Sequence, residues 1–328
     1  MLARIFALIG MLVLGTLLAS CTLVDGDGRH LAPLSYATTS QLSMMGSSPA
    51  SPMMIRIYKE EAVLEVWKQT SSGRFRLFKS YDICAWSGEL GPKFYEGDRQ
   101  APEGFYTITP GLMNPRSNYY LAFNLGFPNR YDQYHGRTGS NLMVHGACSS
   151  AGCYAMEDEQ IAEIYALARE VFAGGNPSFE VQVFPFRMNP QNIARHRDSQ
   201  HLDFWMNLKE GADYFEVAGA PPAWDVCAGR YVFFEPNAAM AAANLAGACP
   251  PVRANPQIVS AFVERQANDL RSLEAVISGQ TAAAEREEQR QAALSARTQA
   301  INGFFGGLFG GGAAQPVPAD VAVVDVQP

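Results

Sequence analysis

Residues 143–156 constrain the fold of this chain more than any other stretch. The stretch begins within an apolar run, residues 142–144, of the kind that forms the end of a strand. That run stops at His145 and Gly146. Small residues then lead to Gly152 and Cys153, so the histidine and the cysteine are eight positions apart and each lies beside a glycine. The pattern predicts a strand that ends on the histidine, followed by a tight loop that carries the cysteine.

A histidine and a cysteine in such a loop point to thiol chemistry. A thiol nucleophile needs a base, and it needs backbone N–H groups aimed at the oxyanion that forms on attack. Cys153 is the candidate nucleophile and His145 the base, while Gly152 lacks a Cβ and lets substrate approach the backbone. Ser150 is expected to shape the turn and to donate a hydrogen bond. The alternatives are a buried free thiol beside a structural histidine, or half of a metal site.

A zinc site is disfavoured because no Cys-x-x-Cys or His-x-x-x-His pair completes a ligand set. We therefore expect neither a metal nor an organic cofactor. The net charge of −7 and the absence of a basic stripe also argue against a nucleic-acid partner.

Several motifs together resemble the L,D-transpeptidase (YkuD-type) superfamily. His-Gly followed by Ser-x-Gly-Cys is similar to its active-site signature, and residues 100–108 (QAPEGFYTI) resemble its Thr-Pro-x-Gly-x-Phe segment. Three segments resemble its YafK-like branch: residues 143–146 (MVHG), residues 152–156 (GCYAM) and residues 204–211 (FWMNLKEG). The resemblance covers about residues 52–235.

This resemblance implies a mainly β catalytic domain with packed helices, β-sandwich-like in architecture. It also implies a cysteine-dependent transferase that acts on peptidoglycan stem peptides and so on cell-wall organisation. The acyl acceptor stays open. An amine acceptor gives 3-3 crosslinks or attaches a lipoprotein, whereas water gives a hydrolase that detaches lipoprotein from stem peptides. A third hypothesis is an inactive peptidoglycan-binding lipoprotein.

Two departures from the family pattern affect the site. The connection between His-Gly and the cysteine is shorter than usual, and Ala155 stands where the family has an arginine two places after the cysteine. Arg137 is a candidate replacement on charge alone. His135, eighteen residues before Cys153, is the second candidate for the base. His145 is preferred because an apolar strand precedes it and Gly146 follows it.

The first twenty residues read as a secretory signal. Arg4 provides the positive start, and the apolar run from Ile5 to Leu18 is too short for a comfortable membrane span. Leu-Ala-Ser-Cys then resembles a lipobox, so cleavage would leave Cys21 as a lipid-bearing N-terminus. Thr22 favours the outer membrane of a Gram-negative bacterium, with the protein facing the periplasm. The alternatives are cleavage by another peptidase and an uncleaved anchor.

The rest of the chain divides by composition. Residues 21–51 are rich in small and polar residues and are expected to be a tether. Residues 52–235 are expected to form the catalytic domain, residues 236–300 an alanine-rich helical extension and residues 301–328 a Gly/Pro-rich flexible tail. Hydrophobic periodicity predicts helices at 158–173 and 202–214, and strands at 54–58, 62–68, 75–81, 105–109, 119–124, 179–186 and 231–234.

The cysteines fit an oxidising compartment. With Cys21 and Cys153 assigned, the four that remain allow three disulfide pairings. Cys227 with Cys249 is the favoured pair because both lie in one loop-rich region. Cys148 is expected to be a buried free thiol, and its pairing with Cys153 under oxidation is the alternative. Cys84 then has no assigned partner.

Overall fold

The computed structural model describes residues 28–235, 249 and 255–309. The predicted signal and Cys21 lie outside the described residues, as do residues 236–248 and 250–254 of the predicted extension and residues 310–328 of the predicted tail. The chain forms two compact units, Met1–Leu270 and Arg271–Pro328. The elements up to α6 (Leu202–Ala218) belong to the first unit, and so does the hairpin of β11 (Ala223–Cys227) and β12 (Arg230–Phe234).

A five-stranded sheet, sheet A, forms the centre of the first unit, in the order β3-β2-β1-β10-β5. β1 pairs parallel with β10 and antiparallel with β2, and the outer pairs are antiparallel. All six residues of β1 are buried, as expected of a strand covered on both faces. The strands are β1 (Met53–Tyr58), β2 (Val63–Gln69), β3 (Phe75–Asp82), β5 (Gly104–Ile108) and β10 (Phe179–Phe184).

A second five-stranded sheet, sheet B, has the order β4-β9-β8-β7-β6. β8 and β9 run parallel, and every other pair in this sheet is antiparallel. The strands are β4 (Ala85–Trp86), β6 (Met113–Asn114), β7 (Ala122–Asn124), β8 (Met143–His145) and β9 (Tyr154–Ala155). Two short helices, η2 (Pro110–Leu112) and α3 (Arg130–Tyr134), lie in its connections.

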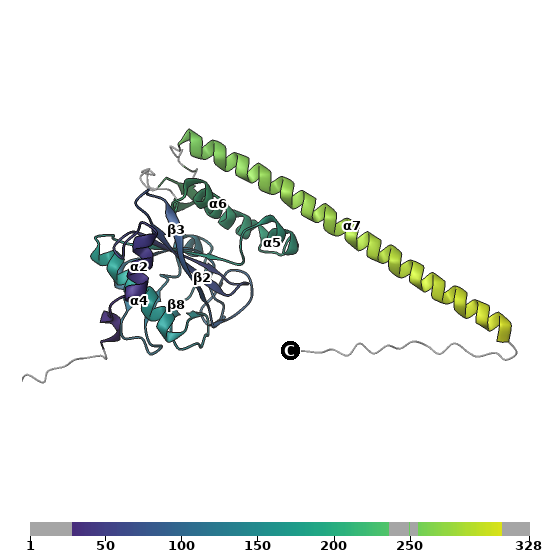
Figure 1. Ribbon diagram of the computed structural model, residues 1–328, viewed down its shortest axis with the longest axis horizontal. Coiled ribbons are helices and arrows are strands. Elements are labelled where there is room, and N and C mark those ends of the chain that lie inside the picture. The colour runs from purple at the N-terminus through teal and green to yellow at the C-terminus, as the bar shows by residue number, and fades with distance from the viewer. Residues whose placement is uncertain (1–27, 236–248, 250–254, 310–328) are drawn as a thin grey trace, which may run out of the picture. The chain divides into compact units, whose positions relative to one another are not determined.

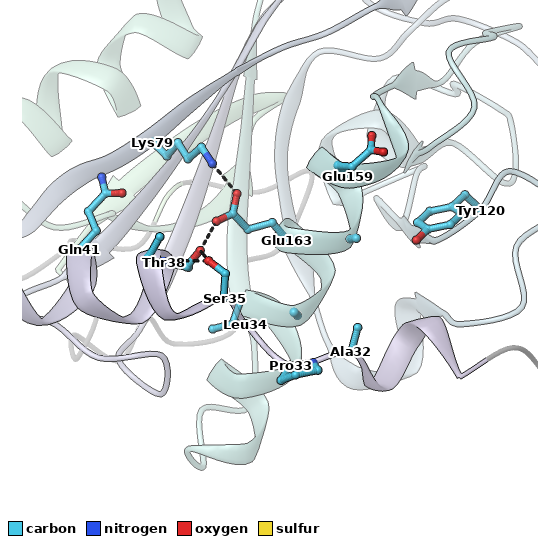
Figure 2. A pocket seen from close by; sticks show the side chains of 13 residues that line it. Ala32, Pro33, Leu34, Ser35, Thr38, Gln41, Lys79, Tyr120, Glu159 and Glu163 are labelled. Carbon is cyan, nitrogen blue, oxygen red and sulfur yellow. Dashed lines mark hydrogen bonds and ion pairs between the residues drawn. The ribbon is translucent and has the colours of Figure 1, made fainter.

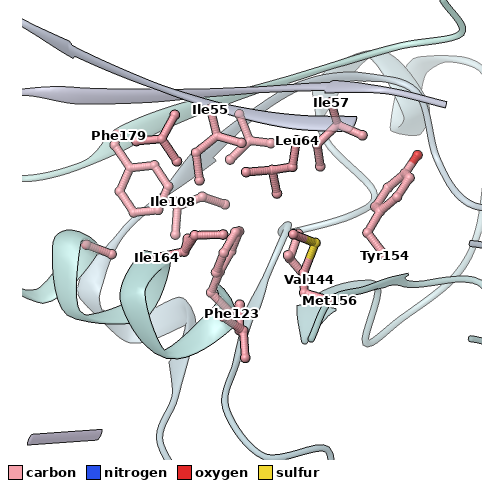
Figure 3. Close-up of a cluster of buried hydrophobic side chains, with 14 of the residues drawn as sticks. Ile55, Ile57, Leu64, Ile108, Phe123, Val144, Tyr154, Met156, Ile164 and Phe179 are labelled. Carbon is pink, nitrogen blue, oxygen red and sulfur yellow. The ribbon is translucent and has the colours of Figure 1, made fainter. Parts of the chain in front are cut away.

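The main core fills the space between sheet A, sheet B and helix α4 (Asp158–Ala173), as Figure 3 shows. Ile161 and Ile164 of α4 are fully buried and belong to one cluster with Ile55 and Ile57 of β1. Each such side chain contributes about 1.5–3 kcal/mol by leaving water. Val144 and Tyr154 belong to the same core, so the strands on either side of the His145–Cys153 loop are fixed by packing.

The opposite face of sheet A is covered by helix α6 (Leu202–Ala218). Its Phe215 packs edge-on against Trp67, with ring centroids 5.2 Å apart, and lies 4.1 Å from the Arg56 guanidinium. Arg56 is buried but paired, because it donates to Gln182 and to Glu216, each at 2.9 Å. Helix α5 (Pro190–Arg195) and the hairpin of β11 (Ala223–Cys227) and β12 (Arg230–Phe234) complete this side.

Part of the segment predicted to be a tether is folded. Residues 28–44 include η1 (Arg29–Leu31) and α2 (Tyr36–Met44), and α2 lies beside α4 (Figure 1). Thr38 of α2 and Lys79 of β3 both donate to the Glu163 carboxylate of α4, at 2.5 and 2.6 Å (Figure 2). The prediction was wrong here because the buried contacts of Thr38 and Leu42 leave no repeated pattern in so short a helix.

The predicted extension contains one long helix, α7 (Pro256–Phe309), which therefore continues into the segment predicted to be a flexible tail. Within the first unit its start is fixed to α6, where Arg265 donates to Asp213 at 2.9 Å. Among the residues that the structure describes, no helix is both long enough and apolar enough to cross a membrane.

The predicted fold class is confirmed: two mainly antiparallel sheets pack with helices around a common core. The predicted helices at 158–173 and 202–214 form, and so do the strands of sheet A. The predicted strand at 119–124 shortens to Ala122–Asn124 because Tyr120 takes a left-handed conformation, with φ of 65°.

Candidate active site at the end of strand β8

The parallel pairing of β8 with β9 brings the two candidate catalytic residues together. Val144 lies opposite Tyr154 and His145 opposite Ala155. Because side chains alternate along a strand, the burial of Val144 and Tyr154 in the core places His145 and Cys153 on the other face. Cys153 lies one residue before β9 and contacts Met143 of β8, which is two residues before His145.

The His145 ring is held in one tautomer. It is 3% exposed, and its Nδ1 lies 2.6 Å from the Gly146 carbonyl oxygen, which can only accept. Nδ1 therefore carries the proton, and Nε2 keeps the lone pair that a general base needs. The ring of Tyr119 covers the imidazole at a centroid distance of 4.7 Å. Burial lowers the pKa of His145, and the bond to the Gly146 carbonyl opposes that shift.

The Cys153 thiol is partly exposed and is the free cysteine among the described residues. The Met143 N–H donates to its Sγ at 3.4 Å, and the thiol faces the Asn141 carbonyl oxygen at 3.6 Å. Burial raises the pKa of the Cys153 thiol, while the Met143 N–H and the charge of Lys93 pull it down. Burial therefore disfavours the charged form of both groups, the thiolate and the imidazolium.

Ser150 organises the turn before the cysteine. Its Oγ accepts from the backbone N–H groups of Gly152 and Cys153, at 3.3 and 3.1 Å, and donates to the Cys153 carbonyl oxygen at 2.7 Å. The N–H groups of Gly152 and Cys153 therefore point at one oxygen atom, as the donors of an oxyanion site must.

Gly146 has no room for a side chain. A Cβ there would lie 2.5 Å from an Asp158 carboxylate oxygen and 2.9 Å from the Cβ of Tyr120. Its N–H donates to the carbonyls of Tyr119 and Leu121, at 3.0 and 3.1 Å. Close packing at this glycine fixes the position of the carbonyl that orients the His145 ring.

A disulfide clamps the loop between the two candidate catalytic residues. Cys84, next to β4, is joined to Cys148, with Cα atoms 5.4 Å apart. The expectation of a buried free thiol at Cys148 was therefore wrong: both cysteines are exposed, and the pairing of β4 with β9 brings them together. Sequence alone gave no pairing of β4 with β9. The predicted pair Cys227–Cys249 is confirmed.

The contacts of His135 and Arg137 in the structure are made to residues outside this loop. His135 Nε2 bonds the Gly229 carbonyl oxygen of the β11–β12 hairpin at 2.9 Å, which favours His145 as the base. The Arg137 guanidinium is buried, bonds Asp132 at 2.8 Å and lies 5.0 Å from the Phe204 ring. Arg137 stabilises the interior, so the suggestion that it replaces the family's arginine is not supported by its position.

The opposite wall of the site is a loop, residues 87–101, whose role the sequence analysis missed. Lys59, which follows β1, donates to the carbonyls of Glu89, Gly91 and Ala101 and to the Glu103 carboxylate, all within 2.7–3.1 Å. Lys59 and Glu103 are fully buried. The signal in the sequence that could have indicated this role was Lys59, a charged residue directly after the mainly apolar strand of residues 53–58. The buried pair ties the loop to sheet A.

Comparison with known proteins identifies the family of this chain. The L,D-transpeptidase catalytic domain (YkuD) matches residues 48–183. The chain is 42% identical over 228 residues to the L,D-transpeptidase-type protein YafK of Escherichia coli strain K12, covering 69% of this chain and 90% of that protein. YafK of E. coli O157:H7 gives the same values. This chain belongs to the L,D-transpeptidase family.

L,D-transpeptidases act on peptidoglycan stem peptides, and the family match begins before β1 and ends within β10, so it includes the His145–Cys153 loop.

Solved structures of lower similarity also align with this L,D-transpeptidase. The helical cell shape determining protein Pgp2 of Campylobacter jejuni aligns with a TM-score of 0.34 at 19% identity, over 58% of this chain and 65% of that chain. A mutant form of Pgp2 gives 0.35 at 21% identity, over 59% of this chain and 64% of that chain. The Bdellovibrio bacteriovorus protein Bd1075 gives 0.30 at 20% identity, over 52% of this chain and 61% of that chain.

Proposed function

We propose that this L,D-transpeptidase acts through a thioester on Cys153, with His145 as its base. The observation that supports the proposal is the parallel pairing of β8 with β9, from which, by the alternation of side chains along strands, we infer that thiol and imidazole share one face. The bond from Nδ1 to the Gly146 carbonyl, at 2.6 Å, leaves Nε2 as the basic nitrogen. The alternative, a buried free thiol beside a structural histidine, does not explain why the Cys153 sulfur is partly exposed or why the His145 tautomer is fixed.

The proposed reaction begins when Nε2 of His145 takes the proton of the Cys153 thiol. The thiolate attacks the carbonyl carbon of a stem-peptide residue, by family resemblance the carbonyl at the L-centre of diaminopimelate. The carbon–nitrogen bond then breaks, and the imidazolium returns its proton to the leaving amine. An acceptor amine, or water, attacks the thioester and gives its proton to His145, so that the free thiol re-forms.

The oxyanion of each tetrahedral intermediate is held by the N–H groups of Gly152 and Cys153 once the Ser150 hydroxyl turns aside. Loss of one such donor typically costs on the order of 10²–10³ in rate. Replacing Gly152 by proline removes one of these N–H groups and is expected to abolish turnover while the thiol remains.

A muropeptide profile by mass spectrometry tests the proposal and identifies the acceptor. Sacculi treated with the intact protein are compared with sacculi treated with the Cys153→Ala variant. New 3-3 dimers that depend on the thiol identify a crosslinking enzyme, and newly attached lipoprotein-derived residues identify lipoprotein attachment. Thiol-dependent loss of such residues without new dimers identifies the hydrolase. Identical profiles contradict the proposal and leave a peptidoglycan-binding lipoprotein.

We also propose that Cys21 carries lipid and holds the enzyme on the periplasmic side of the outer membrane. The lipobox-like Leu-Ala-Ser-Cys sequence supports this, and so does its place a few residues before η1, the first described element. The mass of the mature N-terminal peptide tests the proposal. A peptide that starts at Cys21 with added acyl mass supports it, and an unmodified N-terminus elsewhere contradicts it.

A further inference from the structure

Arg99 lies at the rim of the Cys153 site. Its backbone carbonyl carbon is 3.9 Å from the position that a Cβ on Gly152 would take, and the Gln100 carbonyl oxygen is 3.8 Å from the same point. Arg99 therefore stands beside the turn that carries the nucleophile, on the loop that forms the opposite wall.

Two side chains hold Arg99 in place. Asp98 accepts from the backbone N–H groups of Phe94, Tyr95 and Gln100, at 2.9, 3.1 and 3.0 Å, and folds the loop on both sides of Arg99. Ser87 donates to the Arg99 carbonyl oxygen at 2.8 Å, and its Oγ is also 3.4 Å from the Ser150 Oγ. The position of Arg99 is thus coupled to the serine that organises the nucleophile turn.

The side chain of Arg99 is left available by this arrangement. It is exposed, and in the part of the chain that the structure describes its guanidinium makes neither a hydrogen bond nor an ion pair. The neighbouring Asp98 carboxylate is instead neutralised by the buried Lys93 ammonium. Arg99 also has a φ of 55°, a left-handed conformation that non-glycine residues adopt uncommonly.

From this arrangement we infer that Arg99 forms a carboxylate-binding subsite beside Cys153 and selects substrate peptides that carry a free carboxylate. A guanidinium presents a planar fork of donors that matches a carboxylate, and such a paired interaction is stronger than a neutral hydrogen bond. The inference rests on the proposed function for the identity of the substrate, a stem peptide.

Two free carboxylates of a stem tetrapeptide lie on either side of the attacked bond and offer this chemistry. Diaminopimelate has two carboxyl groups, and the one outside the peptide bond is free. The C-terminal residue provides the other carboxylate. Synthetic stem tetrapeptides with both groups free, or with one or the other amidated, separate these sources.

Binding to the full-length Cys153→Ala protein, kept in detergent and measured by calorimetry, tests the subsite without turnover. Arg99→Gln is expected to weaken binding of the free-carboxylate peptide about tenfold, and Arg99→Lys less. The matched control is Arg76→Gln, which removes an exposed arginine from edge strand β3 and is expected to leave affinity unchanged.

The decisive comparison is the loss of affinity on amidation of the peptide, measured both in the protein with Arg99 and in the Arg99→Gln variant. If the subsite exists, amidation of one of the two carboxylates costs about tenfold in the Arg99 protein and less than about twofold after Arg99→Gln. The peptide whose amidation shows this difference identifies the carboxylate. Equal costs in both proteins overturn the inference, and so does an Arg99→Gln variant that binds as tightly as Arg76→Gln.

Failure of the proposed function gives a different result. In that case the protein with its Cys153 thiol intact releases no product from these peptides, even where the carboxylate-dependent binding is present. Turnover that depends on Cys153 and is insensitive to Arg99 overturns the subsite alone.

Discussion

The clamp between Cys84 and Cys148 should affect stability and activity together. Replacing both cysteines by serine opens a crosslink between residues 64 positions apart. The chain-entropy estimate for a loop of that length is about 4 kcal/mol of unfolding free energy. The clamp also holds the loop between His145 and Cys153, so its loss should lower the rate of thioester formation beyond any loss of folded protein.

The Cys227–Cys249 pair provides a control of similar size. Its residues are 22 positions apart, and the same estimate gives about 3 kcal/mol for its removal. Each double serine variant is unfolded in urea to give its stability. Acylation of Cys153 by a synthetic tetrapeptide stem is then followed by the intact mass of the protein, at a temperature where both variants are folded.

We expect both variants to be less stable, with at least a roughly tenfold slower acylation after loss of the Cys84–Cys148 clamp and little change after loss of the other pair. Equal acylation rates in the two variants would refute the claim that the clamp positions the catalytic loop.

Single contacts give three further predictions. Because burial raises the pKa of Cys153, its alkylation by iodoacetamide should accelerate with pH through a midpoint above the ordinary thiol value of 9.0; a rate that is flat well below that value would indicate a preformed ion pair instead. Gly146→Ala should reduce activity at least about tenfold because its Cβ would meet Asp158 at 2.5 Å, while Gly111→Ala, which meets nothing within 4 Å, should leave activity unchanged. Glu103→Gln should lower the unfolding free energy by about 3 kcal/mol because it leaves a fully buried lysine uncompensated, and an unchanged urea midpoint would contradict that role.

The family resemblance predicted the fold class, and local patterns in the sequence predicted individual elements and singled out the candidate nucleophile turn. The alternation of Val63 to Trp67 and the periodic apolar residues of α4 encode their elements directly, since each side chain reports which face it occupies. Cys153 and His145 could be paired in the sequence analysis because the turn that joins them is short and contiguous in sequence.

The remaining features depend on contacts between distant segments. The Cys84–Cys148 pair requires β4 to lie beside β9, and two-residue strands leave no periodic signal. The location of Arg99 depends on the fold of the loop around Asp98, where one carboxylate gathers three backbone N–H groups. Arg137 looked available by its charge, and the folded chain shows that Asp132 holds it in the interior.

The central claim is that Cys153 becomes acylated by a peptidoglycan stem peptide. The most direct measurement is the intact mass of the full-length protein after rapid mixing with a synthetic tetrapeptide stem, followed by acid quench and peptide mapping. The account predicts a thioester adduct on the peptide that contains Cys153, which disappears in Cys153→Ala and accumulates more slowly in His145→Ala. An adduct elsewhere, or product formation that survives in Cys153→Ala, would contradict it.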